Sequence, residues 1–153
     1  MLIKGPNKEI INIENIILDL NGTLAVNGQV SEKAKQLVVE LKQLGYKLVL
    51  ISGDIRGNAK NVAEELDLDL YLGTNSSEKA KQMQRFDKEK TAAIGNARID
   101  IGTFENAKIS IATLQSEGIH SGIINYVDLI VPSIEDALNL FIDVKSLEAT
   151  LRT

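Results

Sequence analysis

Short apolar runs alternate with amphipathic segments along most of this chain, and this alternation constrains the fold more than any other sequence feature. Each run is short enough to be a buried strand. Strands that alternate with helices are joined by right-handed crossovers into a parallel sheet that is covered on both faces. The sequence therefore predicts an α/β fold with a doubly wound parallel sheet. The expected strands are 16–18, 48–51, 68–72, 91–94, 108–112 and 127–131.

Three of the intervening segments carry apolar residues at helical spacing. The first, 34–41, follows Ser31, which is a suitable N-cap. The second spans 59–66. The third, 134–141, opens with Ser133 and has Asp136 three residues later, an arrangement typical of a capping box.

The two ends of the chain differ from this alternating pattern. Residues 1–15 contain two short apolar pieces around the turn at 5–8, which predicts a β-hairpin ahead of the core. Residues 144–153 predict a closing helix behind the core at 16–143. A length of 153 residues fits one domain, 1–153.

Composition limits the classes of function. The formal net charge is −4, so no basic surplus favours nucleic acid as a partner. Cysteine is absent, which excludes disulfides and thiolate metal sites. No apolar window approaches the roughly 20 residues of a membrane span, and the N-terminus lacks a signal-like segment. We therefore expect a cytoplasmic protein with no membrane contact.

Small, polar and acidic residues follow several of the expected strands. Ligands of open α/β sheets bind beyond the carboxyl ends of the strands. The segments to consider are 19–23, 52–54, 73–75 and 95–100. Turns favour the same residue types, so one such segment alone carries little weight.

These segments resemble the motifs of a known superfamily. "DLNGT", "LISGD", a following lysine and "IGNARID" have the order and approximate spacing of the four motifs of the haloacid dehalogenase-like (HAD) superfamily of phosphohydrolases. The stretch 48–83 resembles P-type ATPase phosphorylation domains from their TGD motif to the catalytic lysine, and 91–113 resembles their GDGxND segment. The likeness covers 16 to about 133 and implies a Rossmannoid HAD-like fold, as in soluble P-type ATPase-like phosphatases.

The resemblance implies roles for individual residues. Asp19 matches the nucleophile that forms an aspartyl phosphate, and Thr23 matches the threonine that supports its loop. Ser52 matches the hydroxyl that binds a phosphoryl oxygen. Gly53 would leave backbone N–H groups accessible to the same anion.

A lysine is expected to pair with the nucleophile and the transferred phosphoryl group. Lys79 is our choice, since it follows two serines at an expected helix start. Lys81 is the competing candidate.

The resemblance also implies Mg²⁺ as a cofactor, since this ion prefers oxygen ligands. The expected ligands are a carboxylate oxygen of Asp19, the backbone carbonyl of Asn21, and a side-chain oxygen of Asn96 or Asp100. Because Asn96 is neutral, we expect weaker Mg²⁺ binding, with Asp100 taking a larger share.

Three residues depart from the family pattern. Asn21 replaces the aspartate of HAD phosphatases, Asn96 replaces the first acid of the last motif, and Ile99 replaces the asparagine of the pumps. An amide at position 21 cannot donate or accept the proton, and such help commonly contributes about 10²–10⁴ in rate. We therefore expect a slow or gated phosphoenzyme.

The spacing of the motifs leaves no room for a cap domain. One helix and one strand fill the interval from Thr23 to Ser52, and the interval from Ser52 to Lys79 is filled in the same way. An uncapped site is open to water and to large substrates. Capless family members are often oligomeric, so we expect this chain to form a homo-oligomer.

Two classes of function remain. The first is a Mg²⁺-dependent phosphohydrolase or phosphotransferase that acts on a phosphorylated substrate through Asp19. The second is a catalytically impaired regulatory or binding module that keeps the fold, as the amides at positions 21 and 96 suggest. Formation of a phosphoryl adduct at Asp19 distinguishes them.

Overall fold

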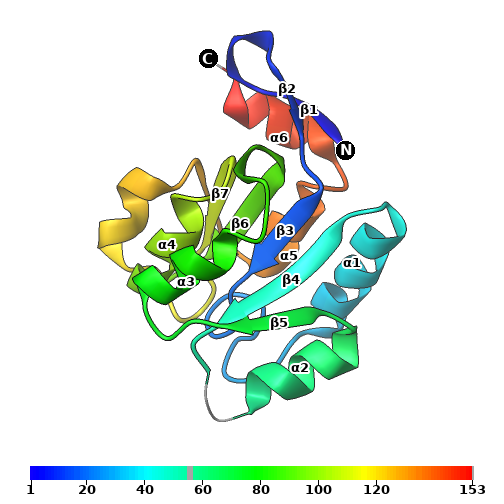
Figure 1. Ribbon diagram of the computed structural model, residues 1–153. Coiled ribbons are helices and arrows are strands. Elements are labelled where there is room, and N and C mark those ends of the chain that lie inside the picture. Colours follow the sequence, from blue (N-terminus) through cyan, green and yellow to red (C-terminus); the bar gives the residue numbers. More distant parts are fainter. Residues whose placement is uncertain (55–56, 153) are drawn as a thin grey trace.

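The computed structural model describes residues 1–54 and 57–152 and centres on a six-stranded parallel sheet (Figure 1). The strand order is β5-β4-β3-β6-β7-β8. All six strands lie within two residues of the expected ranges, so the predicted parallel sheet is confirmed. The strands are β3 Asn15–Leu18, β4 Lys47–Ser52, β5 Asp69–Leu72, β6 Thr91–Gly95, β7 Ile109–Thr113 and β8 Leu129–Val131.

Helices connect the strands and cover both faces of the sheet. Alternate residues of β3 point to opposite faces, because strand side chains have a period of two. Ile16 and Leu18 join the core under α1, α2 and α5, while Ile17 joins the core under α3, α4 and η4. The doubly wound arrangement is therefore confirmed. The helices are α1 Glu32–Gln43, α2 Asn58–Leu66, α3 Ser76–Met83, α4 Ile101–Phe104, α5 Ile134–Asn139 and α6 Val144–Leu151, with 3-10 turns η1 Pro6–Lys8, η2 Lys88–Lys90, η3 Arg98–Asp100 and η4 Ser121–Tyr126.

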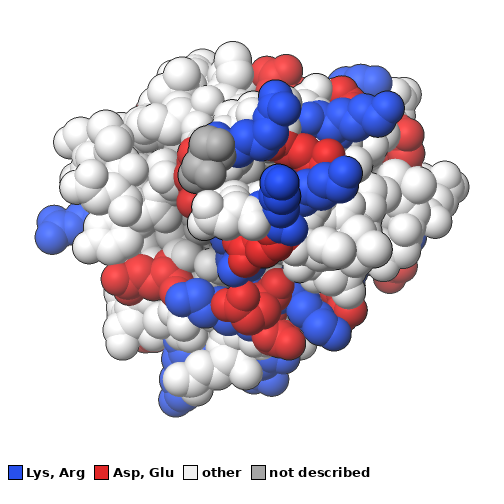
Figure 2. All heavy atoms as spheres, turned by 90° about the horizontal axis from the view of Figure 1, so that it is seen from above, with Lys and Arg blue, Asp and Glu red and all other residues white. Residues whose placement is uncertain are grey.

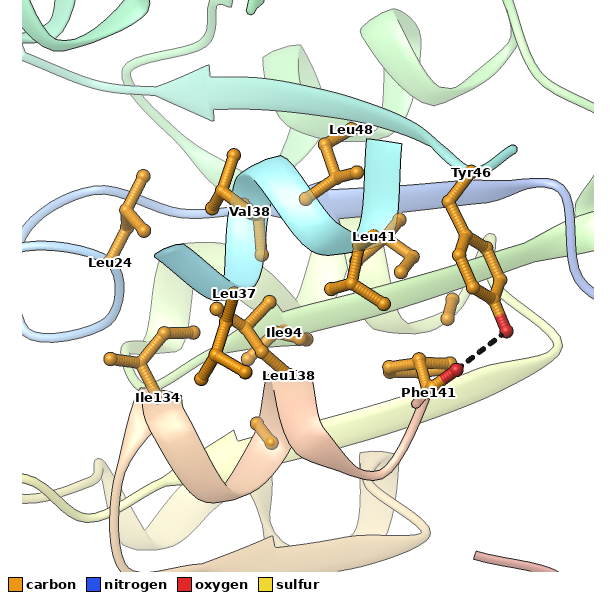
Figure 3. Packing of buried hydrophobic residues seen from close by; sticks show 14 of the residues in the cluster. Leu24, Leu37, Val38, Leu41, Tyr46, Leu48, Ile94, Ile134, Leu138 and Phe141 are labelled. Carbon is orange, nitrogen blue, oxygen red and sulfur yellow. Dashed lines mark hydrogen bonds between the residues drawn. The ribbon is translucent and has the colours of Figure 1, made fainter. Parts of the chain in front are cut away.

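The contact between α1 and α5 forms much of the larger core (Figure 3). Ser31 caps α1 as expected, since its hydroxyl accepts a hydrogen bond from the Ala34 N–H at 3.0 Å. Helix α5 ends at Asn139, before the predicted end at residue 141. The chain tightens into a turn there, and the Tyr46 hydroxyl donates to the Phe141 carbonyl at 3.0 Å, as the dashed line in Figure 3 marks. Phe141 is fully buried although it lies beyond the end of α5. Its place in the apolar pattern of 134–141 therefore comes from packing in the core and not from a helical conformation.

The N-terminal hairpin is present as predicted. Strands β1 Leu2–Lys4 and β2 Ile10–Asn12 pair antiparallel, with Ile3 opposite Ile11. Both isoleucines are buried in the larger core, which fixes the hairpin to the domain. In Figure 1 the hairpin and α6 lie together at the top of the molecule. Because β2 leads directly into the start of β3, this is the amino end of the strands.

The chain contains no inserted cap within the residues that the structure describes. Helix α1 and strand β4 occupy the interval between Thr23 and Ser52, after a tight turn at 26–29. Helix α2, strand β5 and the start of α3 occupy the interval between Ser52 and Lys79. In the described ranges, no helix is long and apolar enough to cross a membrane.

Candidate active site

The order of the strands brings three motif segments together at one edge of the sheet. Strand β3 lies between β4 and β6, so the chain runs outward from β3 to β5 and then returns to the other side of β3. Crevices at such switch points are where α/β sheets bind ligands. A cleft of about 610 Å³ opens at the carboxyl ends of these strands. It is lined by Asp19, Asn21, Ser52, Gly53, Asp54, Asn58, Thr74, Ala97 and Ile99.

A buried lysine joins two carboxylates beside this cleft. The Lys79 ammonium donates to Asp19 Oδ1 and to Asp100 Oδ1, each at 2.7 Å, and its side chain is 0% exposed. Asn75 caps the start of α3 by accepting a hydrogen bond from the Glu78 N–H at 2.9 Å, and Lys79 lies on the buried side of this helix. Lys81 is exposed on the same helix. The structure therefore places Lys79, and not Lys81, against Asp19.

These three groups carry one uncompensated negative charge. Burial first, and then the charge of Asp100, raise the pKa of Asp19 from 3.8 to about 7 against the opposing effect of Lys79. Burial acts to lower the pKa of Lys79, but the charges of Asp19 and Asp100 outweigh it, so that this pKa is raised. Lys79 is therefore held as a cation, while Asp19 is the group that takes up a proton near neutral pH.

Asp100 is fixed by the turn that follows β6. Its Oδ2 accepts from the Asn96 N–H at 3.0 Å and the Ala97 N–H at 2.9 Å, while Oδ1 accepts from Lys79. A Cβ atom on Gly95 would lie 2.6 Å from the Asp100 carboxyl carbon, so only glycine allows this close approach. Both oxygens of Asp100 are thus engaged by groups of the protein.

The end of β4 presents a hydroxyl and a turn to the same cleft. The Asp54 N–H donates to Ser52 Oγ at 3.0 Å, which leaves the hydroxyl hydrogen of Ser52 free to donate elsewhere. Asp54 in turn accepts from the Ala59 N–H in the first turn of α2 at 2.8 Å. A Cβ on Gly53 would meet the Gly73 carbonyl at 3.1 Å, so this turn packs closely against the end of β5.

Two residues of the loop after Asp19, Asn21 and Thr23, differ in their exposure to solvent. Asn21 is exposed at the cleft, whereas Thr23 is fully buried behind it. The Thr23 hydroxyl donates to Asn96 Oδ1 at 3.3 Å, and Asn96 Nδ2 donates to the Gly118 carbonyl at 3.1 Å. The side chain of Gln115 donates to the Thr23 carbonyl at 2.7 Å. Thr23 and Asn96 therefore hold the loop in place from behind.

Sequence reasoning missed part of this arrangement. Asp54, Asn58 and Thr74 line the cleft. Asp54 and Thr74 lie in the segments 52–54 and 73–75 that were considered above but received no role, whereas Asn58, the first residue of α2, was not considered. Gln115 had no signal in the sequence, because its contact with Thr23 joins loops 92 residues apart in the chain.

Comparison with known proteins places this geometry in a family. A sequence model of the family described as haloacid dehalogenase-like hydrolase matches residues 4–108. The copper-exporting P-type ATPase B of Archaeoglobus fulgidus is 33% identical over 98 residues, 61% of this chain and 14% of that protein. A soluble P-type ATPase-like phosphatase of Methanocaldococcus jannaschii is 24% identical over 123 residues, 77% of this chain and 45% of that protein. The chain spans less than half the length of either relative.

Solved structures share the fold at low sequence identity. The cobalt-bound deoxy-D-mannose-octulosonate 8-phosphate phosphatase of Haemophilus influenzae has a TM-score of 0.74 and 16% identity, covering 93% of this chain and 94% of that chain. The 3-deoxy-D-manno-octulosonate 8-phosphate phosphatase of Moraxella catarrhalis, in complex with magnesium, phosphate and KDO, has a TM-score of 0.70 and 16% identity, covering 90% of each chain. The match to the family covers more than half of the sequence, and on that basis this chain belongs to the haloacid dehalogenase-like hydrolase family.

Proposed function

We propose that the chain is a magnesium-dependent phosphatase that transfers the phosphoryl group of its substrate to Asp19. One observation carries this proposal: Asp19 lines the cleft at the carboxyl end of β3, while the buried Lys79 bonds one of its oxygens at 2.7 Å. A carboxylate held in this way is a fixed nucleophile beside a fixed positive charge. The relatives described as phosphatases support the same reaction class.

The first step forms a bond between an Asp19 oxygen and phosphorus while the bond from phosphorus to the leaving group breaks. Lys79 lies where it can oppose the negative charge of the phosphoryl oxygens. The Ser52 hydroxyl, whose oxygen already accepts the Asp54 N–H, donates its hydrogen to a phosphoryl oxygen. The leaving oxygen takes its proton from water, because the Asn21 side chain has no acidic proton to give.

The second step is the attack of water on the phosphorus of phospho-Asp19, which releases phosphate and regenerates the carboxylate. Asn21 is exposed at the cleft, where a carboxylate could accept the proton of that water. An amide cannot do so, and general acid–base help contributes about 10²–10⁴ in rate. Breakdown of the phosphoenzyme is therefore the slow step in this proposal.

The oxygen donors near Asp19 fit a magnesium ion. We assign its binding to Asp19 and to the main-chain carbonyl of Asn21, which are hard oxygen donors of the kind that Mg²⁺ prefers. The side-chain oxygen of Asn96, expected as a further ligand, accepts a hydrogen bond from the Thr23 hydroxyl behind the cleft. Burial and the charge of Asp100 together raise the pKa of Asp19 to about 7, and a cation bound there would compensate the negative charge of the two carboxylates. When bound, the ion neutralises charge on the phosphoryl group and on the nucleophile.

Asp100 was expected to take a larger share of the metal, and its contacts support a different role. Its two oxygens accept hydrogen bonds from Lys79 and from the N–H groups of Asn96 and Ala97. We therefore assign Asp100 to positioning Lys79.

Incubation of freshly prepared protein with Mg²⁺ and acetyl phosphate or an aryl phosphate tests the proposal. We expect released phosphate, or a phosphoryl mass increment that is lost in Asp19→Ala and kept in Asp69→Ala, a matched variant at an exposed aspartate. Fresh protein matters because Asn21-Gly22 is a deamidation-prone pair. The absence of both turnover and adduct across a panel of phosphoesters would contradict the proposal and favour a binding module instead.

The variant Asn21→Asp tests the assignment of the slow step. We expect the adduct to break down about 10²–10⁴ times faster than in the wild type, while its rate of formation with acetyl phosphate changes little. An unchanged adduct lifetime would show that Asn21 does not limit the reaction.

A further inference from the structure

A second groove lies at the opposite end of the molecule from the active-site cleft. It runs between the hairpin turn and α6 and has a volume of about 520 Å³. Four of its lining residues are cationic and one is acidic: Lys4, Lys8, Lys145, Arg152 and Glu148. Figure 2 looks down onto this end, where Lys and Arg side chains lie among acidic ones near the middle of the view. The groove shares no lining residue with the cleft around Asp19.

The cations of this groove lack acidic partners. Elsewhere in the described residues, seven lysines form ion pairs with aspartate or glutamate. In the same described ranges, the side chains of Lys4, Lys8, Lys145 and Arg152 form none. The carboxylate of Glu148 accepts a hydrogen bond from the backbone N–H of Lys4 at 2.9 Å, so it serves the main chain of the hairpin. A chain with a net charge of −4 thus gathers four unpaired cations around one groove.

Helix α6 and the hairpin turn present these cations in different ways. On α6, Lys145 and Glu148 share one face, because residues three apart line one side of a helix, and Arg152 follows directly after the last helical residue. The opposite face packs inward through Leu147, which is fully buried. On the hairpin, Lys8 has a φ of 64°.

The backbone at Lys8 favours glycine over lysine. A positive φ brings Cβ close to the backbone, and glycine adopts it without that strain. Asn7, with a φ of 57°, is of a type that tolerates this region, whereas lysine is not. Lysine therefore occupies a strained position whose side chain borders the groove, an arrangement typical of functional sites.

We propose that this groove binds a small anion that carries two or more phosphoryl groups. Several separate cations match several charged groups on one ligand, and arginine can bind a phosphoryl group through two hydrogen bonds. The volume lies within the usual range of about 300–1,000 Å³ for small-molecule sites. A long polyanion fits less well, because the negative charge of the rest of the chain repels it. The proposal does not depend on catalysis at Asp19.

Calorimetric titration with inorganic pyrophosphate at low ionic strength tests the proposal. EDTA in the buffer withholds divalent cations from the active-site cleft. We expect wild-type binding with a Kd below about 1 mM, and at least about tenfold weaker binding by Lys145→Glu/Arg152→Glu. The matched double variant Lys33→Glu/Lys81→Glu changes the net charge equally at two exposed lysines outside the groove, and should bind within about threefold of the wild type.

A separate variant distinguishes binding from folding. Lys8→Gly removes one charge and relieves the positive φ, so we expect weaker pyrophosphate binding together with an equal or higher thermal midpoint. Absence of wild-type binding, or equal binding by both double variants, would overturn the proposal. So would orthophosphate binding as tightly as pyrophosphate, or a hexaglutamate peptide binding more tightly than either.

Discussion

Replacing Lys79 by methionine would remove the only positive charge that contacts Asp19 and Asp100 within the described residues. The ammonium lies 2.7 Å from an oxygen of each carboxylate, and the side chain is 0% exposed. Methionine keeps most of the unbranched stem of lysine. This stem packs closely against Gly73, since a Cβ added to that glycine would lie 2.9 Å from Lys79 Cγ. The substitution therefore deletes the charge while leaving the packing of the stem largely unchanged.

The expected cost follows from the burial of the two carboxylates. Removal of one partner from a buried ion pair costs about 3–5 kcal/mol, because the other charge is left without compensation. Here one lysine compensates two carboxylates, so we expect a loss toward the upper end of that range at pH 8. This is a large share of the roughly 5–15 kcal/mol that stabilises a typical domain.

The cost should shrink in acid. Lys79 opposes the rise in the pKa of Asp19, so this pKa lies above about 7 once the lysine is gone. At pH 5 the folded variant then carries a protonated Asp19, and the repulsion from Asp100 disappears. We therefore expect the difference in the free energy of unfolding between wild type and variant to be at least about 1 kcal/mol smaller at pH 5 than at pH 8.

Urea unfolding at the two pH values measures both effects. Lys81→Met is the matched control, because Lys81 is exposed on the same helix and its loss should change stability by no more than about 0.5 kcal/mol. Equal losses for the two variants at pH 8, or a loss for Lys79→Met that does not depend on pH, would refute the account of a buried three-charge cluster.

Three further predictions concern groups around the same site. Without divalent cations, the free energy of unfolding should fall by up to about 4 kcal/mol as the pH rises from 3.8 to about 7, because folded Asp19 keeps a proton that the unfolded chain has lost. In urea unfolding, Asp19→Asn should remove this dependence of stability on pH. Asn96→Asp should lose about 1–3 kcal/mol in urea unfolding in EDTA at pH 7, because the bond from its amide to the Gly118 carbonyl becomes an oxygen–oxygen contact. Glu78→Gln should speed hydrogen exchange at the Thr74 N–H, because Glu78 Oε2 accepts from both the backbone and the hydroxyl of Thr74.

The sequence was sufficient to predict the parts of the site that depend on strand ends. Asp19 and Ser52 lie at the ends of neighbouring parallel strands, and parallel strands end at a common edge. The sequence favoured Lys79 but left Lys81 as an open alternative. Residues two apart on a helix point to nearly opposite sides, so the choice depends on which side of α3 faces the sheet. That side is set by tertiary packing.

Contacts between loops were beyond what the sequence could predict. Gln115 reaches the Thr23 carbonyl, and the Thr113 hydroxyl reaches the Gly22 carbonyl at 3.4 Å. Bonds from a side chain to a distant main chain leave no periodicity in the sequence. The short elements η3 and α4 are too brief to show a helical repeat, so their place beside α3 also required the structure.

Asn21 and Asn96, which the resemblance sets against aspartates of HAD phosphatases, differ in what surrounds them. Asn96 uses both ends of its amide, accepting from Thr23 and donating to Gly118, so an amide at this position contributes to the fold. Asn21 is exposed at the cleft, and among the described residues its side chain makes no hydrogen bond there. Restoring an aspartate should therefore have opposite consequences at the two sites. Asn96→Asp should change stability, whereas Asn21→Asp should change the lifetime of phospho-Asp19 with little effect on unfolding, and a reversal of these two results would show that the roles are exchanged.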